Sequence, residues 1–531
     1  MEFRGLPPIG QKQRRPMDGA QFHLPWVGEA GGRLERIQSS TGMLDEDQSF
    51  MTRAQRSSRH RRAIAWLVAI AFMNRLPAHS QQPAPAADPV PNAPSANIPE
   101  RENFFARWAH FYARDWAPPT NASSSPARRG LPSPLDSPPF PNSDWSYGGS
   151  PVIGEPDTNS YPLMTAINDA SSRTKLYGWI GPSLNFSTSS HLNLPEANDM
   201  YSDRFELNQL VIYAERLPDS VQRGHIDWGY HLTALYGTDY RFTFGKGYFS
   251  GQWLDHHRQY GFDPTLEYLD IYIPWFQGAN LRVGRFISVP GIEAQLAPNN
   301  YIFSHSLLYA IDPFTDTGLM ATLKLTDQWL VQAGITGEHD VAPWTPDARP
   351  SATACVSYTT HSVNDNLYAC ANGINNGKYA YNNLQQYDAT WYHKFSKSVH
   401  LATETWYMYE RDVPAVGGSI QPETGANGAY CFPGEQRCTA PEYAAVSYLQ
   451  KELSGHDFLS FRADFLDDKK GQRTGYATKY SENTIMVCHW VGSTVQIRPE
   501  LRFERSWDRP AYDSGRHQNQ LTVASDLIFH F

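Results

Sequence analysis

The chain lacks a long hydrophobic run, and it has no excess of basic over acidic residues. After residue 80 it has no stretch of about 18 apolar residues, which excludes a membrane-spanning helix in that part of the chain. Charged residues are only 19% of the 531 residues, and the formal net charge of −9 excludes a nucleic-acid-binding protein, since the phosphate backbone requires positive contacts. The GxSxG, Walker and GxGxxG-after-strand motifs are also absent. We therefore expect no catalytic residues and no enzyme activity.

Cysteine is scarce, and its spacing excludes a zinc site. The five cysteines form no CxxC pair and lie in no His-rich segment, so we expect neither a metal nor a cofactor. Cys355 and Cys370, and likewise Cys431 and Cys438, are short-range pairs within long polar segments. We predict that both pairs are disulfides in outer loops, formed in an oxidising compartment. We expect the remaining Cys488 to be a buried, inert thiol.

The first 80 residues have the pattern of an extension followed by an export signal. Residues 1–50 show no periodicity, and we expect them to be unstructured. Within residues 51–80, five arginines precede the apolar run Ala63–Met73, and Ala78 and Ser80 supply small residues before a cleavage site. This order of basic, apolar and small residues predicts a secretory signal peptide.

Residues 81–173 form a proline-rich lead-in, which we expect to be periplasmic. Of the 39 prolines, 17 lie between Gln81 and Pro162, which favours extended chain. A short helix is predicted near 101–116, because its aromatic residues share one stripe. This helix could contact a membrane surface or a partner, or pack at the mouth of the next domain; residues 117–160 could cross that mouth.

The region 174–531 has the pattern of consecutive β-hairpins. In its last segment, the apolar residues Leu521, Val523, Leu527 and Phe529 alternate with mostly more polar ones. A period of two predicts a strand with one apolar and one more polar face. The same pattern along the region predicts about 14 strands, within a range of roughly 12–16. The predicted strands are 175–186, 204–216, 225–237, 266–275, 280–286, 318–325, 328–337, 385–395, 398–410, 442–451, 456–466, 477–490, 495–507 and 517–531.

The connections between these strands alternate in length. If Phe531 ends at the periplasmic side, the connections on that side are all short: 217–224, 276–279, 326–327, 396–397, 452–455 and 491–494. Those on the other side are mostly long: 238–265, 287–317, 338–384, 411–441 and 508–516. This asymmetry is typical of outer-membrane barrels, and a soluble sandwich or propeller gives no reason for it. We therefore predict an all-β fold, a transmembrane antiparallel β-barrel with long external loops.

Several predicted strands carry polar residues on the face opposite their apolar residues. A charge that faces lipid costs up to ~2–4 kcal/mol near the bilayer midplane, so a charged face must point to a wet lumen. We predict that nine such residues line a pore: Tyr268, Asp270, Tyr272, Arg462, Asp464, Arg498, Glu500, Arg502 and Glu504.

The segment Ile287–Thr317 is too apolar for a loop in water, with residues such as Ile292, Leu296 and Leu307. We predict that it folds into the barrel and narrows it; the alternative is a lid that packs on neighbouring loops. Its polar residues would then lie at the constriction: Glu293, His305, Asp312 and Asp316.

A set of short motifs spans the region from Tyr177 to the C-terminus. They are Tyr177–Trp179, Asp227–Gly229, Leu235–Tyr240, Arg282–Phe286, Gly291–Glu293, Asp467–Asp468, Arg473–Gly475, Arg498–Glu500 and the terminal Phe531. Taken together, they resemble the OmpL-like β-barrel porin family of bacterial outer-membrane proteins. The resemblance implies a barrel porin in the outer membrane and supplies no catalytic residues. The proline-rich lead-in and residues 1–50 lie outside it.

The pattern and the resemblance lead to one expected function and two alternatives. We expect a porin in the outer membrane of a Gram-negative-type bacterium, through which small hydrophilic solutes diffuse passively along a charged and aromatic lumen. The alternatives are a secreted, soluble carbohydrate-binding or carbohydrate-active β-protein, and an outer-membrane adhesin or enzyme that does not transport. The expected partners are outer-membrane lipid, the solutes, the barrel-assembly machinery through Phe531, and further copies in a homo-oligomer.

Overall fold

A computed structural model describes residues 102–117, 161–195, 199–220, 222–248, 259–289, 291–362, 364–396, 398–415 and 428–531. The predicted extension, the predicted signal peptide and most of the lead-in, including 118–160, lie outside these residues. The described part of the lead-in contains helices α2 (Phe104–Asp115) and α3 (Pro162–Ala166), and α2 falls within the range in which the sequence predicts a helix. None of the described helices combines the length and the apolar character needed to cross a membrane.

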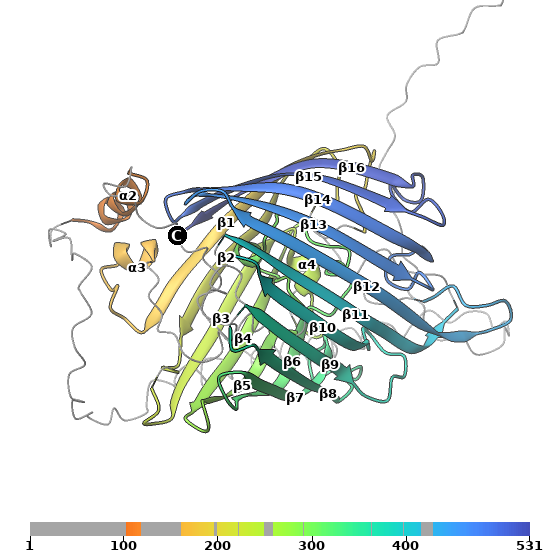
Figure 1. Ribbon diagram of the computed structural model, residues 1–531, viewed down its shortest axis with the longest axis horizontal. Helices are drawn as coiled ribbons and strands as arrows, with labels where there is room; N and C mark the ends of the chain where they lie inside the picture. Colours follow the sequence, from red (N-terminus) through yellow and green to blue (C-terminus); the bar gives the residue numbers. More distant parts are fainter. Residues whose placement is uncertain are drawn as a thin grey trace, which may run out of the picture. The chain divides into compact units, whose positions relative to one another are not determined.

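The described residues form sixteen strands that close into an antiparallel barrel (Figure 1). The strands are β1 (Thr174–Ser187), β2 (Phe205–Arg216), β3 (Asp227–Gly237), β4 (Gly261–Ile273), β5 (Ala279–Ile287), β6 (Thr315–Lys324), β7 (Trp329–His339), β8 (Ser351–Thr359), β9 (Asp365–Ile374), β10 (Gln385–Lys394), β11 (Val399–Pro414), β12 (Arg437–Glu452), β13 (Asp457–Asp468), β14 (Thr478–Val491), β15 (Val495–Ser506) and β16 (Asn519–His530). Each strand pairs with its neighbours in the sequence, and two short helical turns, α4 (Tyr240–Thr243) and η2 (Ala297–Asn299), lie in the connections.

The barrel closes between its first and last strands. β1 pairs with β16 from Trp179 opposite His530 onward. The last residue continues this pairing, because the Phe531 N–H donates to the Gly178 carbonyl oxygen at 2.8 Å and the Gly178 N–H donates back at 3.0 Å. A Cβ atom at Gly178 would lie 2.8 Å from the Phe531 ring, so glycine leaves the room that the ring needs. The C-terminal Phe531 therefore takes part in closing the wall.

Strands β8 and β9 lie in the segment 338–384, which the sequence pattern assigned to a single external connection. That assignment was wrong, although sixteen strands falls within the predicted range. The physical reason is the outward face of β8, where Ala352 and Ala354 precede Val356. Alanine contrasts weakly with the inward Ser, Thr and Cys residues, so the period of two is hard to detect. The turn 360–364 between the two strands is short and lies on the same side as Phe531, as the predicted asymmetry requires.

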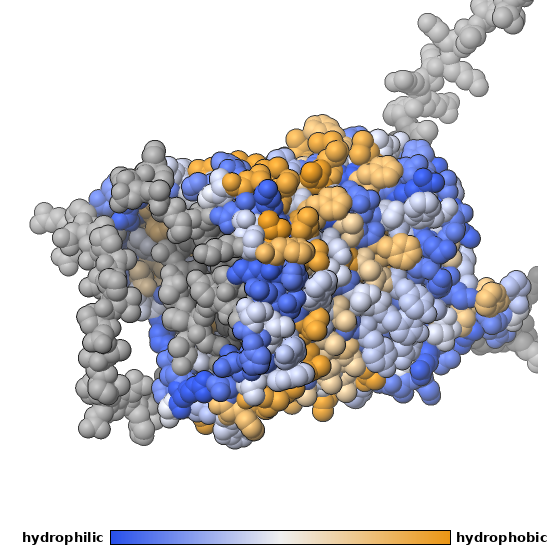
Figure 2. Space-filling model, in the orientation of Figure 1, coloured by the Kyte–Doolittle hydropathy of each residue, from blue (hydrophilic) through white to orange (hydrophobic). Residues whose placement is uncertain are grey.

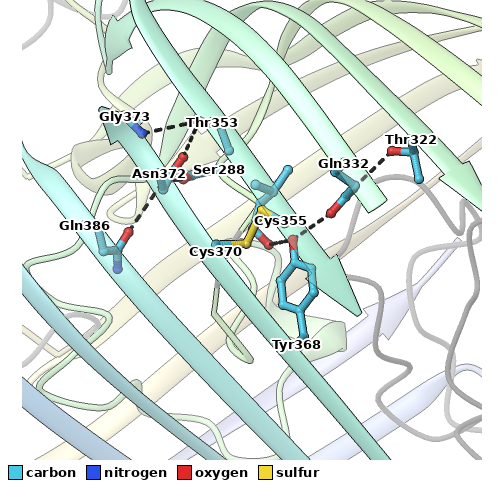
Figure 3. The surroundings of a disulfide bond; sticks show 11 residues. Ser288, Thr322, Gln332, Thr353, Cys355, Tyr368, Cys370, Asn372, Gly373 and Gln386 are labelled. Atoms are coloured by element: carbon cyan, nitrogen blue, oxygen red, sulfur yellow. Dashed lines mark hydrogen bonds between the residues drawn. A yellow bond between two sulfur atoms is a disulfide. The ribbon is translucent and has the colours of Figure 1, made fainter. Parts of the chain in front are cut away.

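Cys355 and Cys370 are opposite residues of β8 and β9 and form a disulfide (Figure 3). The predicted pairing is confirmed, but its predicted position was wrong, because the bond lies on the inward face of the wall and not in an outer loop. Beside it, the Tyr368 hydroxyl donates to Gln332 Oε1 at 2.6 Å (Figure 3). The second predicted disulfide, Cys431–Cys438, joins an external connection to the start of β12, and Cys488 is a buried thiol of β14.

Removing the disulfide of the wall is expected to weaken the barrel. In a Cys355→Ala/Cys370→Ala variant the free energy of unfolding should fall by about 3 kcal/mol, because a bond across 15 residues restricts the unfolded chain. Urea unfolding in detergent, followed by tryptophan fluorescence, measures this loss. The matched variant Cys431→Ala/Cys438→Ala spans 7 residues and should lose about 2 kcal/mol. Equal stability of the first variant and the wild type would contradict the expectation.

The outward face of the barrel is an apolar belt bordered by aromatic side chains, and Figure 2 shows many apolar side chains on the wall that faces the viewer. Exposed aromatic residues near the short turns are Trp228, Trp275, Phe276, Trp329, Trp391 and Phe395. Those near the opposite strand ends are Phe186, Phe205, Tyr236, Tyr387, Tyr443 and Trp507. Exposed aliphatic residues such as Ile212, Leu319 and Val523 lie between the two groups. Two aromatic girdles around an apolar belt are typical of barrels that span a membrane.

Candidate functional site

The inward face of the barrel is polar and almost completely covered. All nine residues predicted to line a pore occupy inward positions of β4, β13 and β15, and none exposes more than 6% of its surface. The terminal strand follows the same rule, since Asp526 and His530 point inward while Leu521, Val523 and Leu527 are exposed. The inward residues must therefore be covered by other parts of the chain.

The segment 288–314 between β5 and β6, which we call the inner loop, covers much of this face. Its polar backbone groups are held by inward side chains from strands far apart around the barrel. The bonds are Ile292 N–H to Glu404 of β11 (2.8 Å), Ser304 N–H to Glu500 of β15 (2.9 Å), Leu307 N–H to Asp464 of β13 (3.0 Å), and Gln209 Nε2 of β2 to the Gln295 carbonyl oxygen (2.8 Å). A loop bonded to β2, β11, β13 and β15 at once lies inside the barrel between these walls.

Arg462 of β13 is the centre of the charged wall. Its guanidinium is fully buried and donates to Glu482 Oε2 of β14 at 2.7 Å. The same group donates to the carbonyl oxygen and the hydroxyl of Ser304 at 2.6 and 2.9 Å. It also lies 3.9 Å from the carboxylates of Glu293 and Asp464. One arginine therefore compensates several buried acids and fixes the inner loop to the wall.

Arg498 of β15 forms a second attachment of the inner loop. Its Nε and Nη2 atoms donate to the two carboxylate oxygens of Asp526 on β16 at 2.9 and 2.5 Å. Its third nitrogen donates to the Ala297 carbonyl oxygen at 3.0 Å. The planar guanidinium can make both contacts at once, because two of its nitrogens bind the carboxylate and the third donates to the loop. Farther along β15, Arg502 and Glu504 form an ion pair at 2.5 Å.

Glu293 and His305 form a buried pair within the inner loop, outside the spanning strands. His305 Nδ1 lies 3.2 Å from Glu293 Oε1, and the Ser306 N–H donates to the same oxygen at 3.0 Å. Burial acts to raise the pKa of Glu293, but its hydrogen bond with His305 and the nearby charges, including Arg462, hold that pKa below its ordinary value. Burial lowers the pKa of His305 and outweighs the opposing effect of Glu293. At neutral pH the pair therefore presents a negative charge to Arg462.

The other two predicted constriction residues have different surroundings. Asp312 belongs to the inner loop, where burial, with the charges of Glu404 and Glu293, holds its pKa well above the ordinary value. Its surroundings therefore favour the neutral form of the carboxyl group. Asp316 belongs instead to β6, and its Oδ1 lies 2.7 Å from His339 Nδ1 of β7. The structure thus places Asp312 on the inner loop and Asp316 in the wall.

A row of neighbouring rings begins at Tyr161, at the start of α3, and continues along the inward face of β1 to β4. Their centroid separations are 4.7 Å for Tyr161–Tyr177, 4.7 Å for Tyr177–Tyr213, 4.8 Å for Tyr213–His231 and 5.0 Å for His231–Tyr268. Arg282 of β5 ends the row, because it lies 3.7 Å from the Tyr268 ring centroid and donates to both oxygens of Asp270 at 3.0 Å. Nearby, the Tyr272 hydroxyl donates to the Gln222 carbonyl oxygen at 2.7 Å. This sector is aromatic where the sector of β13 to β16 is ionic.

Sequence reasoning missed several anchors of the inner loop, among them Glu404 and Glu482. The position of Glu482 could have been inferred, because the outward Ile485 and Val487 define the two faces of β14. The signal is weaker around Glu404, since its outward neighbour Thr405 is polar.

The chemistry available inside the barrel is electrostatic. Arginines and carboxylates are held at fixed positions on the wall and the loop, so they can attract or repel charged solutes without moving. Among the described residues, one group has the spacing of metal ligands, namely Cys431, Glu435 and Cys438. Its two sulfurs are joined in a disulfide, so they are not the thiolates that a metal requires.

A comparison with protein families agrees with this architecture. Residues 175–531 match the model of a family described as "Putative beta-barrel porin-2, OmpL-like". No curated protein matches the sequence. Among solved structures, the chain is similar to an anion-selective porin from Comamonas acidovorans, with 10% identity and a TM-score of 0.42 over 67% of this chain and 99% of that chain. It is also similar to the outer membrane channel DcaP of Acinetobacter baumannii, with 10% identity and a TM-score of 0.41 over 67% of this chain and 97% of that chain.

Proposed function

Since this chain belongs to the OmpL-like β-barrel porin family, we propose that small hydrophilic solutes cross the outer membrane through its lumen by passive diffusion. The protein is an outer-membrane barrel, because the family match covers residues 175–531 and thus the barrel from its second residue to its end. The soluble, secreted alternative is excluded by this membership, and the girdled apolar belt agrees with it.

The observation that supports this mechanism is the inner loop, which lies between walls that carry fixed charges of both signs. Four predicted pore-lining residues are themselves bonded to the loop, namely Arg462, Asp464, Arg498 and Glu500, so we propose that the loop sets the width of the passage. Glu293, His305 and Asp312 would form its narrowest part, with Asp316 beside them. Tyr268, Asp270 and Tyr272 would form the aromatic side of the path. Because arginines and carboxylates lie on the same wall, we expect no strong preference for anions over cations or the reverse.

Further partners are proposed on the same basis. Phe531 ends the chain within the closing ladder of β1 and β16, so it is available to the barrel-assembly machinery only before the barrel closes. Outer-membrane lipid would surround the apolar belt, and a homo-oligomer would cover part of it.

Conductance in planar bilayers tests the proposed function. Purified protein, folded as judged by a heat-modifiable band, is expected to produce discrete current steps that increase with salt concentration. The Cys431→Ala/Cys438→Ala variant, once folded, serves as a matched control and should show the same step size, because it alters an external connection and not the inner loop. Folded protein that produces no current steps would instead favour the non-transporting adhesin or enzyme.

A further inference from the structure

Helix α2 precedes the residues that match the porin family and packs on the outward side of the closing strands. The Tyr112 hydroxyl donates to the His530 carbonyl oxygen at 2.8 Å, and the Tyr112 ring lies 5.0 Å from the ring of Phe529. Phe529 shares the outward face of β16 with the exposed Leu521, Val523 and Leu527. The helix therefore covers part of the face that the rest of the barrel presents to lipid.

The end of α2 is attached to the turn between β14 and β15. The Asp115 carboxylate accepts the Ser493 N–H at 3.0 Å, the Ser493 hydroxyl at 2.7 Å and the Thr494 hydroxyl at 2.6 Å. Trp116 Nε1 donates to Thr494 Oγ1 at 2.9 Å. A Cβ atom at Gly492 would lie 2.4 Å from the Asp115 carboxylate, so the turn is shaped for this contact. The helix is thus fixed at the end of the barrel where the short turns lie.

One stripe of α2 is aromatic, and the opposite stripe is small or basic. Neighbouring rings along the stripe lie 5.2 to 6.0 Å apart, and they belong to Phe104, Phe105, Trp108, Tyr112 and Trp116. Contact with the barrel does not use the whole stripe, because Phe105 remains 73% exposed and Trp116 45% exposed. On other sides of the helix, Ala113 and Arg114 are exposed. Exposed rings beside a basic stripe are typical of helices that lie in a membrane interface.

The aromatic girdle on this side of the barrel is interrupted at the closing strands. Exposed aromatic residues occur near the short turns of β3 to β11, as at Trp228, Trp275 and Trp391. Among the described residues of β14, β15, β16 and β1, no exposed Phe, Tyr or Trp occurs at the corresponding end. The rings of α2 lie over this sector, as the contacts with Phe529 and Thr494 show.

We propose that α2 lies in the periplasmic interface of the outer membrane, where it binds phospholipid and completes the aromatic girdle across the closing strands. Phe105 and the exposed edge of Trp116 enter the region between headgroups and acyl chains, where the apolar face of an interfacial helix places such rings. Arg114 lies on the polar side, where a phosphate group offers a complementary charge. The occupant is lipid and not a protein, because the exposed rings continue the surface that the barrel already presents to the bilayer. This assignment is independent of transport through the lumen.

Quenching of a fluorescent label tests the proposal on the full chain. Bimane is attached at Phe105→Cys, a substitution that the exposure of the ring should allow, and at His110→Cys, an exposed position about 140° around the helix from Phe105. The protein is placed in vesicles of phosphatidylethanolamine and phosphatidylglycerol. We expect a nitroxide near the lipid headgroup to quench position 105 and iodide to quench position 110, with an iodide quenching constant several-fold lower at 105 than at 110. Unsubstituted protein controls for labelling of the buried Cys488.

Three results would overturn the proposal. Equal access of iodide to both positions would place α2 in water. Shielding of position 105 from both iodide and the lipid nitroxide would show that protein, such as a second copy of this chain, covers the stripe. If headgroup nitroxide quenches both positions equally, the helix has no fixed orientation toward the bilayer. A heat-modifiable band for each labelled protein confirms that the barrel itself is assembled.

Discussion

Replacing Arg462 with alanine is expected to lower the free energy of unfolding by about 3–5 kcal/mol, the range for breaking a buried ion pair. The guanidinium is the partner of Glu482 at 2.7 Å and lies close to Glu293 and Asp464, all of them buried. Without it these carboxylates face one another with no cation between them, and the Ser304 carbonyl oxygen loses its 2.6 Å donor. Urea unfolding in detergent, monitored by tryptophan fluorescence and by the heat-modifiable band, measures the loss.

Two further variants define what the arginine contributes. Arg505→Ala, on the exposed outward face of β15, removes an arginine that lies over the Trp507 ring at 4.4 Å, and the free energy of unfolding should fall by about 0.5–1 kcal/mol. Arg462→Lys keeps the charge but not the planar fork, so it should recover only part of the stability. If Arg462→Ala unfolds at the same urea concentration as Arg505→Ala, the network around Arg462 does not stabilise the barrel.

The barrel could be predicted from the sequence because its main signal is local. In β16 the outward Leu521, Val523 and Leu527 identify one face within a few residues, and β15 repeats this pattern with Leu501 and Phe503. The hairpin β8–β9 gave no such signal, since alanine takes the place of larger apolar residues on its outward face. The disulfide was recognised as a pair, but its place in the wall depended on that missing hairpin.

The interior depends on contacts between residues that are distant in the sequence. Arg462 and Ser304 are 158 positions apart, and Ile292 and Glu404 are 112 apart. An apolar composition indicated that the inner loop avoids water, but nothing local indicates which side chains hold it. The same limit applies to α2, whose aromatic stripe is visible in the sequence while its attachment to Ser493 and Thr494 is not.

Replacing residues 291–312 of the inner loop with a short Gly-Ser linker is expected to raise the single-channel conductance several-fold. The loop is bonded to β2, β11, β13 and β15, so its removal frees the space between these walls. The anchors Glu404, Asp464, Glu500 and Arg498 then face water in a wider lumen, which can hydrate them, so the barrel should still fold. Current steps in planar bilayers, compared with the wild type at the same salt concentration, measure the change.

The matched control for this variant alters a connection that does not enter the barrel. The segment Pro343–Pro350 joins β7 to β8, and it includes Trp344, which is 68% exposed. A Gly-Ser linker in its place should leave the conductance unchanged, because none of the bonds that hold the inner loop involves it. If the folded inner-loop variant keeps the wild-type conductance, the wall and not the loop limits the passage. If both variants conduct more than the wild type, the external mouth contributes to the resistance, and the inner loop is not the sole constriction.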